Sequence, residues 1–260
     1  MPDDELRGNL NAALLKSGFP FQRKVKQIIH AAPEWSVLYE EFPWRDDLNA
    51  KDSFLDIVAG TKQLLITVEC KKAEDEKILF LVEPDGPVPE CSCVSLGLQG
   101  NLSTPFPSAW IIRPESPNAT FAIPFRNGKP DSNRLLEVDI QQLLRGTITA
   151  ARSKQAQRTV QSLQAPLPIL PLYVTTAELL VTEVDYDQLD LRTGKVTPNA
   201  QDFRSTPFVR FTKTFISYKD VEVPSLTAIV VQAHHIAELL SKFANRSPIE
   251  MPESRNRAFY

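Results

Sequence analysis

The stretch SFLDIVAGTKQLLITVECKK, residues 53–72, sets the expectations for the whole chain. It predicts two apolar strands that fold back on each other through a turn near Gly60. Because side chains alternate between the two faces of a strand, Glu69 and Lys71 are expected to project from the same face. The turn places Asp56 roughly opposite Glu69 across the hairpin. Two carboxylates and one ammonium group therefore converge on a hairpin rich in Leu, Ile and Val.

This group of charges is costly to bury unless a ligand compensates it. Two neighbouring carboxylates repel each other, and burial increases the cost. A divalent cation removes the repulsion, and Mg²⁺ binds through few protein carboxylates while it keeps positions for water and a substrate phosphate. A nearby lysine can orient the attacking water, help to deprotonate it, or stabilise developing charge. The pattern indicates phosphodiester hydrolysis, although Glu-x-Lys in a strand is more often an exposed face with a weak ion pair.

The segments around the hairpin add helices and strands in a definite order. Apolar spacing predicts helices over residues 3–16 and 21–32, and partial alternation predicts a strand over 35–44. A further strand is expected over 76–84, and a long helical stretch begins at residue 134. This order, with an aspartate in the second strand and Glu-x-Lys in the third, resembles the PD-(D/E)XK nuclease superfamily, whose fold is called restriction-endonuclease-like.

Two short motifs carry the resemblance: FLDIVAG around Asp56, and TVECKK around Glu69, Cys70 and Lys71. The resemblance implies a site for Mg²⁺ or Mn²⁺ whose ligands are Asp56, Glu69 and the backbone carbonyl of Cys70. It also implies that Lys71 acts on the attacking water. Many members carry a glutamate on the first core helix, where this chain offers Gln22. A neutral amide can still ligate a metal or orient a water, so Gln22 joins the candidate catalytic residues.

The resemblance covers residues 18–82, and the remainder is interpreted from its composition. Residues 84–133 are rich in Pro, Gly, Ser and Asn and predict an insertion of short strands and loops. The helical stretch over 134–164 is expected to kink near Gly146. Further strands, and a last strand that passes into a helix, are predicted over 168–196, 207–217 and 226–245. The polar tail over 246–260 is expected to be loose.

The long helix carries the candidate nucleic-acid contacts, which are Arg145, Arg152, Lys154 and Arg158. Some members of the superfamily use basic residues on the helix after the catalytic hairpin to contact DNA. For any single residue a solvated helix face is the commoner explanation. Because Arg152 and Lys154 do not share one narrow stripe, at most a subset of the four is expected to contact a substrate.

Composition limits the classes of protein that remain. The 260 residues are 42% hydrophobic with a formal net charge of −3, which is ordinary for a globular chain and argues against a general polyanion-coating protein. Three cysteines are too few for a disulfide framework and favour a reducing compartment. Without a secretory pattern or a membrane-length apolar run, we expect a cytoplasmic protein with no membrane partner.

Several other chemistries lack their motifs. No G-x-x-x-x-G-K-[ST] is present, so no nucleotide cofactor is expected, and no G-x-S-x-G marks a serine hydrolase. Cys91 and Cys93 have only Cys70 as a further cysteine, which argues against zinc. His234 and His235 lie at a strand-to-helix junction, and one is expected to be packed and the other exposed.

These observations lead to one main prediction and one alternative. The fold is expected to be α/β, a restriction-endonuclease-like core with a central mixed β-sheet flanked by helices and a β/loop insertion. It should form one domain with its core at 18–83 and about 134–245. The function is expected to be Mg²⁺-dependent endonuclease cleavage of DNA, in restriction, anti-phage defence or repair, by a homo-oligomer or with a partner subunit. The alternative is a non-catalytic nuclease-fold subunit that binds nucleic acid or a protein, which the missing helix glutamate and the net charge favour.

Overall fold

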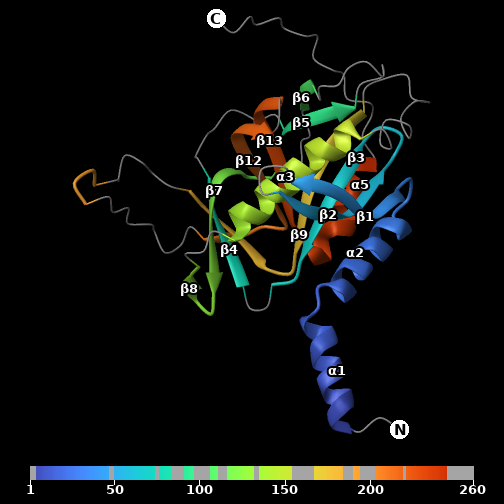
Figure 1. Ribbon diagram of the computed structural model, residues 1–260. Coiled ribbons are helices and arrows are strands. Elements are labelled where there is room, and N and C mark those ends of the chain that lie inside the picture. The colour runs from blue at the N-terminus through green and yellow to red at the C-terminus, as the bar shows by residue number, and fades with distance from the viewer. Residues whose placement is uncertain are drawn as a thin grey trace, which may run out of the picture.

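Figure 1 shows a computed structural model of the chain, in which α1 projects from a body built on one large sheet. The structure describes residues 4–46, 50–73, 76–82, 91–96, 106–110, 116–131, 135–153, 167–183, 190–193, 203–218 and 221–244. The predicted tail over 246–260, and the predicted end of the long helix near residue 164, lie outside these residues. None of the described helices is long and apolar enough to cross a membrane.

One large mixed sheet flanked by a few helices confirms the α/β class. The helices are α1 (Asp4–Lys16), α2 (Phe19–Ala31), α3 (Leu135–Arg152) and α5 (Ile236–Ala244), with a 3₁₀ turn η2 (Ala233–His235). The first strands are β1 (Ser36–Asp46), β2 (Lys51–Gly60), β3 (Leu65–Lys71), β4 (Glu76–Val82), β5 (Cys91–Leu96), β6 (Phe106–Trp110) and β7 (Asn118–Arg126). The others are β8 (Lys129–Pro130), β9 (Leu167–Thr175), β10 (Glu178–Glu183), β11 (Arg204–Ser205), β12 (Phe208–Tyr218) and β13 (Val221–Gln232).

The thirteen strands of the described residues belong to one mixed sheet, and ten of them follow the order β1-β2-β3-β9-β13-β12-β7-β4-β10-β11. The other three lie off this path: β5 pairs with β6 and β9, and β8 pairs with β7. Neighbours β1, β2 and β3 are antiparallel, and β3 runs parallel to β9. Parallel neighbours require a crossover connection, and α3 lies in that connection across one face of the sheet (Figure 1). The strands β1, β2, β3 and β9 therefore form one end of the sheet, and α2 and α3 are the helices that precede β1 and β9.

The predicted insertion over 84–133 is part of this sheet. β7 pairs with β4 and β12, and β5 pairs with the beginning of β9. The Pro- and Gly-rich composition correctly predicted short strands, but it gave no information on which strands they join. Long-range pairing depends on the path of the whole chain, whereas composition reports only local preference.

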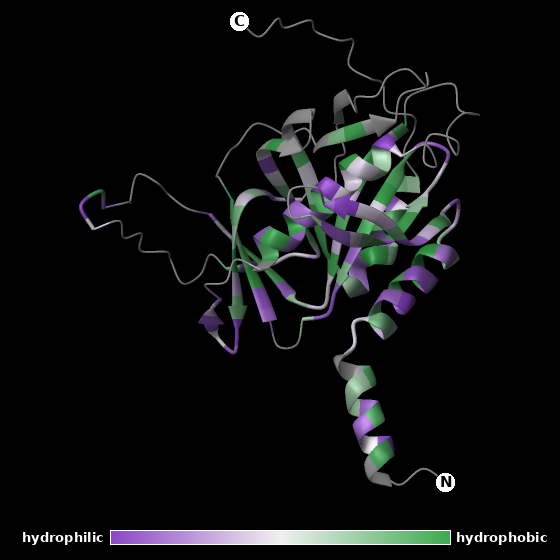
Figure 2. Ribbon diagram, viewed as in Figure 1, coloured by the Kyte–Doolittle hydropathy of each residue, from purple (hydrophilic) through white to green (hydrophobic). Residues whose placement is uncertain are grey.

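Two apolar cores lie on opposite faces of the sheet, and Figure 2 shows the apolar character of its central strands. The first core packs under α3 and includes Leu55, Phe80 and Ile148. The second packs under α2 and α5 and includes Ile57 and Val68. Because β9 is covered on both faces, it is buried along its whole length and almost entirely apolar.

The face that each β2 side chain occupies changes at Asp56. Leu55 lies in the core under α3, but Ile57, two residues later, lies in the core under α2 and α5. Simple alternation would put both on one face. On β1, Glu41 lies opposite Asp56, between the pairs Glu40↔Ile57 and Phe42↔Leu55, and has the left-handed value φ 50°. The side chains of both strands therefore change faces at the same level of the ladder, and Asp56 lies at the position of this change.

Near Gly146, where a kink was expected, α3 continues without a break as one α-helix. A Cβ atom at position 146 would lie 2.7 Å from Leu55 Cδ2 and 3.0 Å from Trp44 Nε1. The glycine therefore allows the helix to approach β1 and β2 closely. Its role is close packing rather than bending.

Candidate functional site

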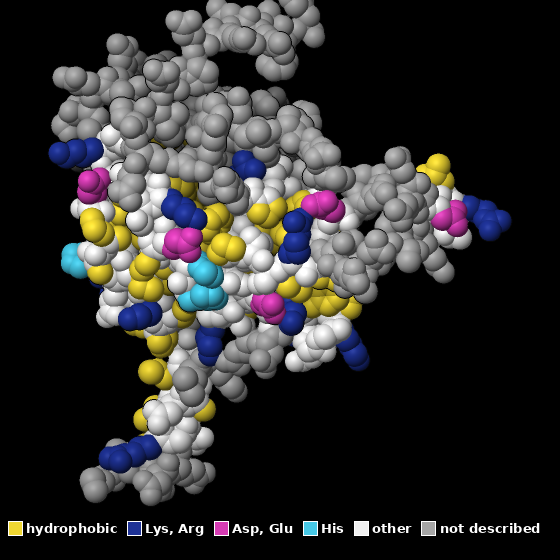
Figure 3. All heavy atoms as spheres, turned by 180° about the vertical axis from the view of Figure 1, so that it is seen from behind, with side chains coloured by type: hydrophobic (Ala, Val, Ile, Leu, Met, Phe, Trp, Pro, Cys, Tyr) yellow, Lys and Arg dark blue, Asp and Glu magenta, His cyan; other side chains and the backbone are white. Residues whose placement is uncertain are grey.

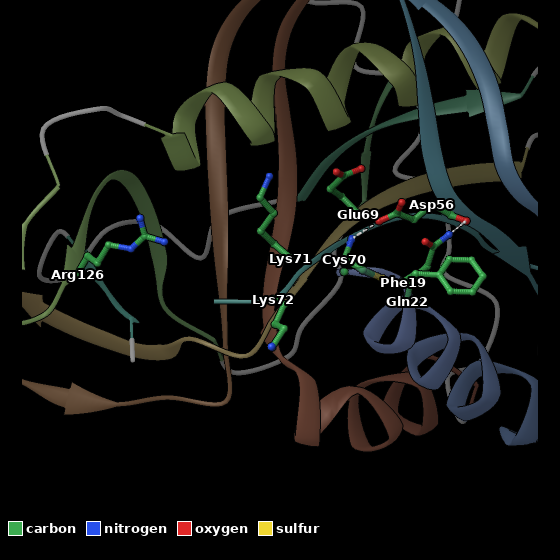
Figure 4. Close-up of a pocket in the computed structure, with 9 residues that line it drawn as sticks. Phe19, Gln22, Asp56, Glu69, Cys70, Lys71, Lys72 and Arg126 are labelled. Atoms are coloured by element: carbon green, nitrogen blue, oxygen red, sulfur yellow. Dashed lines mark hydrogen bonds between the residues drawn. The ribbon is translucent and has the colours of Figure 1, made fainter. Parts of the chain in front are cut away.

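A cleft of about 490 Å³ lies where β2, β3 and the start of α2 meet (Figure 4). Its lining residues are Gly18, Phe19, Gln22, Asp56, Glu69, Cys70, Lys71, Lys72 and Arg126. All five residues that the sequence predicted for metal binding and catalysis are among them. Sequence reasoning did not anticipate Gly18, Phe19 or Arg126. Arg126 comes from β7, which is far from the hairpin along the chain.

Asp56 links three backbone segments. Its Oδ2 accepts a hydrogen bond of 2.7 Å from the backbone N–H of Cys70, and its carbonyl oxygen accepts one of 3.2 Å from Gln22 Nε2. The β2–β3 backbone pairing ends one residue earlier, at Ile57↔Val68. The aspartate side chain thus continues the link between the strands beyond the ladder. Asp56 Oδ1 accepts no hydrogen bond from the described residues, so it is available to a ligand.

Glu69 extends from β3 toward α3, next to Asp56 (Figure 4). Burial raises the pKa of Glu69 to about 8, and the negative charge of Asp56 adds to the rise. Burial also raises the pKa of Asp56, and the hydrogen bond from the Cys70 N–H opposes that rise. Among the described residues, none makes a hydrogen bond or ion pair with the Glu69 carboxylate. The two acids are therefore desolvated together without a fixed cation between them.

Lys71 projects on the same face as Glu69, as strand alternation predicted. Its Nζ lies 3.2 Å from Oδ1 and 3.1 Å from Oδ2 of Asp139, a residue of α3. The hydroxyl of Tyr173 donates to Asp139 Oδ2 at 3.3 Å. Tyr173 is the β9 neighbour of Glu69 in the parallel ladder, so it lies on the same face. Burial and the Asp139 charge raise the pKa of Tyr173, which keeps its hydroxyl protonated as a donor.

Asp139 is thus a site residue that the sequence analysis missed. The only signal available in the sequence was a carboxylate near the start of the helix after the hairpin. Its contact with Lys71 depends on where α3 crosses β3 and β9, and periodicity does not specify that position.

Gln22 and Cys70 complete the predicted set. Gln22 lies on α2 and contacts the backbone of Asp56, so it supports the aspartate in this structure. The Cys70 thiol lies on the opposite face from Glu69 and packs against the core under α2 and α5, and burial raises its pKa. The thiol is therefore not an expected ligand, and any contribution of this residue comes from its backbone.

The four basic residues predicted to contact nucleic acid are not gathered at the cleft. Arg145 Nη1 donates to Asp46 Oδ2 at 3.3 Å, and both side chains are largely buried between α3 and β1. Arg152 is partly buried at the end of α3. Lys154 and Arg158 lie outside the described residues. The cations that line the cleft besides Lys71 are Lys72 and Arg126, and Arg126 is exposed and paired with Glu76 at 3.0 Å.

The donor set fits a hard divalent cation with few protein ligands. In the described part of the chain, no group of three or more His, Cys, Asp and Glu side chains is placed to hold a metal. The cleft offers instead two adjacent carboxylates, Asp56 and Glu69, and burial raises the pKa of both. Mg²⁺ is bound in this way, through one or two carboxylates with water and substrate oxygens.

Comparison with known proteins adds no relative: no family model, no curated protein and no solved structure matches the chain. Function is therefore inferred from the geometry of the cleft.

Proposed function

We propose that the protein is a Mg²⁺- or Mn²⁺-dependent nuclease that hydrolyses phosphodiester bonds in DNA. One observation carries the proposal: Asp56 and Glu69 are desolvated side by side, and the ammonium of Lys71 lies on the same face as Glu69. Restriction, anti-phage defence or repair remains the proposed setting, by analogy with the superfamily that the sequence resembles.

The topology supports the restriction-endonuclease-like core within this proposal. That core is expected to contain a helix, three strands, a second helix and a further strand, with the aspartate and Glu-x-Lys on the second and third strands. Here α2, β1, β2, β3, α3 and β9 follow in that order, although β4 and the insertion strands β5 to β8 lie between β3 and α3. Asp56 lies on β2, and Glu69 and Lys71 lie on β3, beside β9.

The residues predicted for metal binding and catalysis have proposed roles that follow from their contacts. Asp56 and Glu69 would hold the cation, and the bound cation would act as a Lewis acid and lower the pKa of water. Gln22 and the Cys70 N–H fix the backbone and carboxylate of Asp56. Lys71 lies beside this position, where its charge stabilises negative charge that develops on phosphate oxygens. Asp139 and Tyr173 hold Lys71 in place.

Plasmid cleavage tests the proposal. Purified protein should nick or linearise plasmid DNA, or cleave a single-stranded DNA circle, with Mg²⁺ or Mn²⁺, and EDTA should stop it. Asp56→Asn, Glu69→Gln and Lys71→Ala should each lower the rate by at least about 100-fold, since each removes a ligand or a catalytic charge. Glu183→Gln, an exposed carboxylate on β10, is the matched control and should cut normally.

Calorimetry separates the roles of the three residues. Asp56→Asn and Glu69→Gln should weaken Mn²⁺ binding severely, whereas Lys71→Ala should leave it largely intact. A wild-type protein that neither binds Mn²⁺ nor cuts DNA would exclude the nuclease.

One observation favours the non-catalytic alternative. Lys71 is already held in an ion pair with Asp139, as a purely structural lysine would be. A protein that binds DNA but does not cut it with either metal would support this second function.

A further inference from the structure

Phe19 is an exposed aromatic residue on the wall of the cleft. It is the first residue of α2, its exposed fraction is 48%, and it lines the same cleft as Asp56 and Glu69. Figure 4 shows it beside Gln22 and Asp56, away from Lys71 and Arg126. An aromatic ring left half in water at the first turn of a helix contributes little to the core. Because the ring lies in the same cleft as two carboxylates, a ligand with an apolar face could pack on it.

Neighbouring charges limit how the Phe19 ring can move. The Arg23 guanidinium lies over the ring, with Cζ 4.8 Å from its centroid. Arg23 Nη1 in turn donates to Glu40 Oε2 at 2.6 Å, and Lys26 also binds Glu40. The ring is therefore braced on one side by a cation that is itself fixed to β1. A ring held in this way loses little freedom when a second planar group stacks on it.

The cleft combines this ring with groups suited to a phosphate. Asp56 and Glu69 are the candidate cation ligands, and Lys71, Lys72 and Arg126 supply positive charge along the same cleft. A volume of about 490 Å³ is that of a site for a small molecule. A short length of single strand, with a base and its phosphates, matches both the size and the chemistry.

We propose that Phe19 is a stacking platform for an unpaired nucleobase next to the scissile phosphate, so that the preferred substrate is single-stranded nucleic acid. This inference rests on the proposed nuclease function. In a duplex each base is stacked on its neighbours and exposes only its edges in the grooves. In a single strand the faces of the bases are accessible, and stacking on an aromatic side chain accepts any base. The platform therefore predicts strand preference without sequence preference.

Fluorescence anisotropy with the full-length chain tests the platform. The probes are dye-labelled oligonucleotides of DNA and of RNA, as a single strand, as a duplex, and as a single strand with abasic sites. Mg²⁺ is present, and every protein carries Lys71→Ala so that cleavage does not interfere. Phe19→Ala should weaken binding of the intact single strand by roughly 5- to 100-fold. It should change binding of the duplex and of the abasic strand by less than about twofold.

Two further variants identify the cause of the loss. Phe19→Trp should restore single-strand binding because it has an aromatic face, whereas Phe19→Leu should not, although it keeps apolar bulk. Phe203→Ala removes a similarly exposed phenylalanine that does not line the cleft, and it should bind like the Lys71→Ala parent.

The outcomes separate this inference from the proposed function. Binding of every probe that is unchanged by Phe19→Ala, in a protein whose wild-type form cuts DNA, would overturn the platform and leave the nuclease standing. An equal loss on the intact and abasic strands would also overturn it, because the ring would then act without a base. A wild-type protein that binds no oligonucleotide would overturn both proposals.

Discussion

Glu69 shows how its surroundings determine the chemistry of a single residue. It extends from a largely buried strand, and it lies beside a second acid on β2. Burial and that neighbour favour the protonated form, so Glu69 keeps its proton up to about pH 8 in the absence of metal. A bound cation would reverse this preference. Proton release and metal binding are therefore expected to be coupled at this residue.

The pH dependence of stability follows from the same values. The pKa of Glu69 rises from 4.5 to about 8 on folding, so between these pH values the folded chain binds more protons than the unfolded chain. The free energy of unfolding should therefore fall as pH rises through this window. We expect the metal-free protein to melt at a lower temperature at about pH 8 than at about pH 5. Thermal denaturation in EDTA measures this difference.

Glu69→Gln isolates the contribution of Glu69. The amide does not ionise, so this variant should lose much less stability with rising pH and should be more stable than wild type at about pH 8. Parallel pH profiles for the two proteins would contradict the assignment. Addition of Mn²⁺ at the higher pH should raise the melting temperature of wild type but not of the variant.

Asp139 is expected to act through Lys71. One of its carboxylate oxygens lies 3.1 Å from the ammonium, and among the described residues it makes no hydrogen bond with Asp56. Asp139→Asn should lower kcat roughly 10-fold with little change in KM, because it loosens a positioned charge. Combined with Lys71→Ala, it should add less than about a further twofold, since its effect requires the lysine.

The matched control for this double-mutant cycle is Glu137→Gln on the same helix. It breaks the 3.0 Å ion pair of Glu137 with Lys213, which is not at the cleft, and should leave kcat unchanged. Additive losses from Asp139→Asn and Lys71→Ala would indicate a structural role for Asp139 instead.

At the scale of strands and helices, the sequence predicted the faces of β3 but not those of β2. Leu64, Ile66 and Val68 lie in one core and Leu65 in the other, as alternation requires. On β2 the alternation changes at Asp56, together with the positive φ of Glu41 on β1. The sequence of a strand alone does not reveal such a paired turn, because it depends on the neighbour.

The candidate site was likewise predictable only where its residues are close in sequence. Asp56, Glu69 and Lys71 are close in sequence, and one hairpin register brings them together. The contacts of Asp139 and Arg126 depend on a helix crossing and on a strand from the insertion, and local patterns encode neither. Arg145 was predicted from its charge to contact nucleic acid at the surface, but it pairs with the buried Asp46.

Helix α3 must approach the sheet closely to bring Asp139 to Lys71, and Gly146 provides a test of this approach. A Cβ at this position would lie 2.7 Å from Leu55 Cδ2 and 3.0 Å from Trp44 Nε1, and both side chains are buried. Gly146→Ala should therefore lower the free energy of unfolding by about 1–2 kcal/mol, although alanine is the better helix former. Chemical denaturation measures the change.

Gly8 on α1 is the matched control, because a Cβ there would meet no atom within 4 Å. Gly8→Ala should leave the stability unchanged or raise it slightly. A Gly146→Ala protein as stable as wild type would mean that α3 can move away from the sheet. Its catalytic rate would then show whether the Asp139 contact depends on that approach.

At the scale of the whole molecule, the distribution of charge bears on nucleic-acid binding, and the exposed helix α1 bears on association. The net charge of −3 gives little general attraction for a polyanion. In Figure 3, Lys and Arg side chains are dispersed over the face shown, several of them beside acidic residues. On the projecting helix α1, Leu6, Leu10 and Leu14 are 50%, 58% and 63% exposed. Apolar side chains on three successive turns of an exposed helix are typical of an interaction surface.

The spacing of these leucines suits a second copy of the chain. Leu6 and Leu14 are equally distant from Leu10, so two antiparallel copies of α1 related by a two-fold axis would bring Leu10 against Leu10. Leu6 of each copy would then lie against Leu14 of the other. We therefore expect light scattering to show concentration-dependent association of the full chain. Changing all three leucines to glutamine should give a monomer, whereas truncation after Asn245 should not.

Association should also strengthen binding to nucleic acid, because two clefts then engage one strand. The glutamine variant should bind a long single strand more weakly than wild type, but a short oligonucleotide equally well, since each cleft is unchanged. For both proteins, affinity should fall between about 50 mM and about 200 mM salt, because phosphate contacts release counterions. A wild-type chain that stays monomeric at all concentrations, and that binds the long strand no more tightly than the variant, would contradict the role of α1 and leave the assignment of the cleft unaffected.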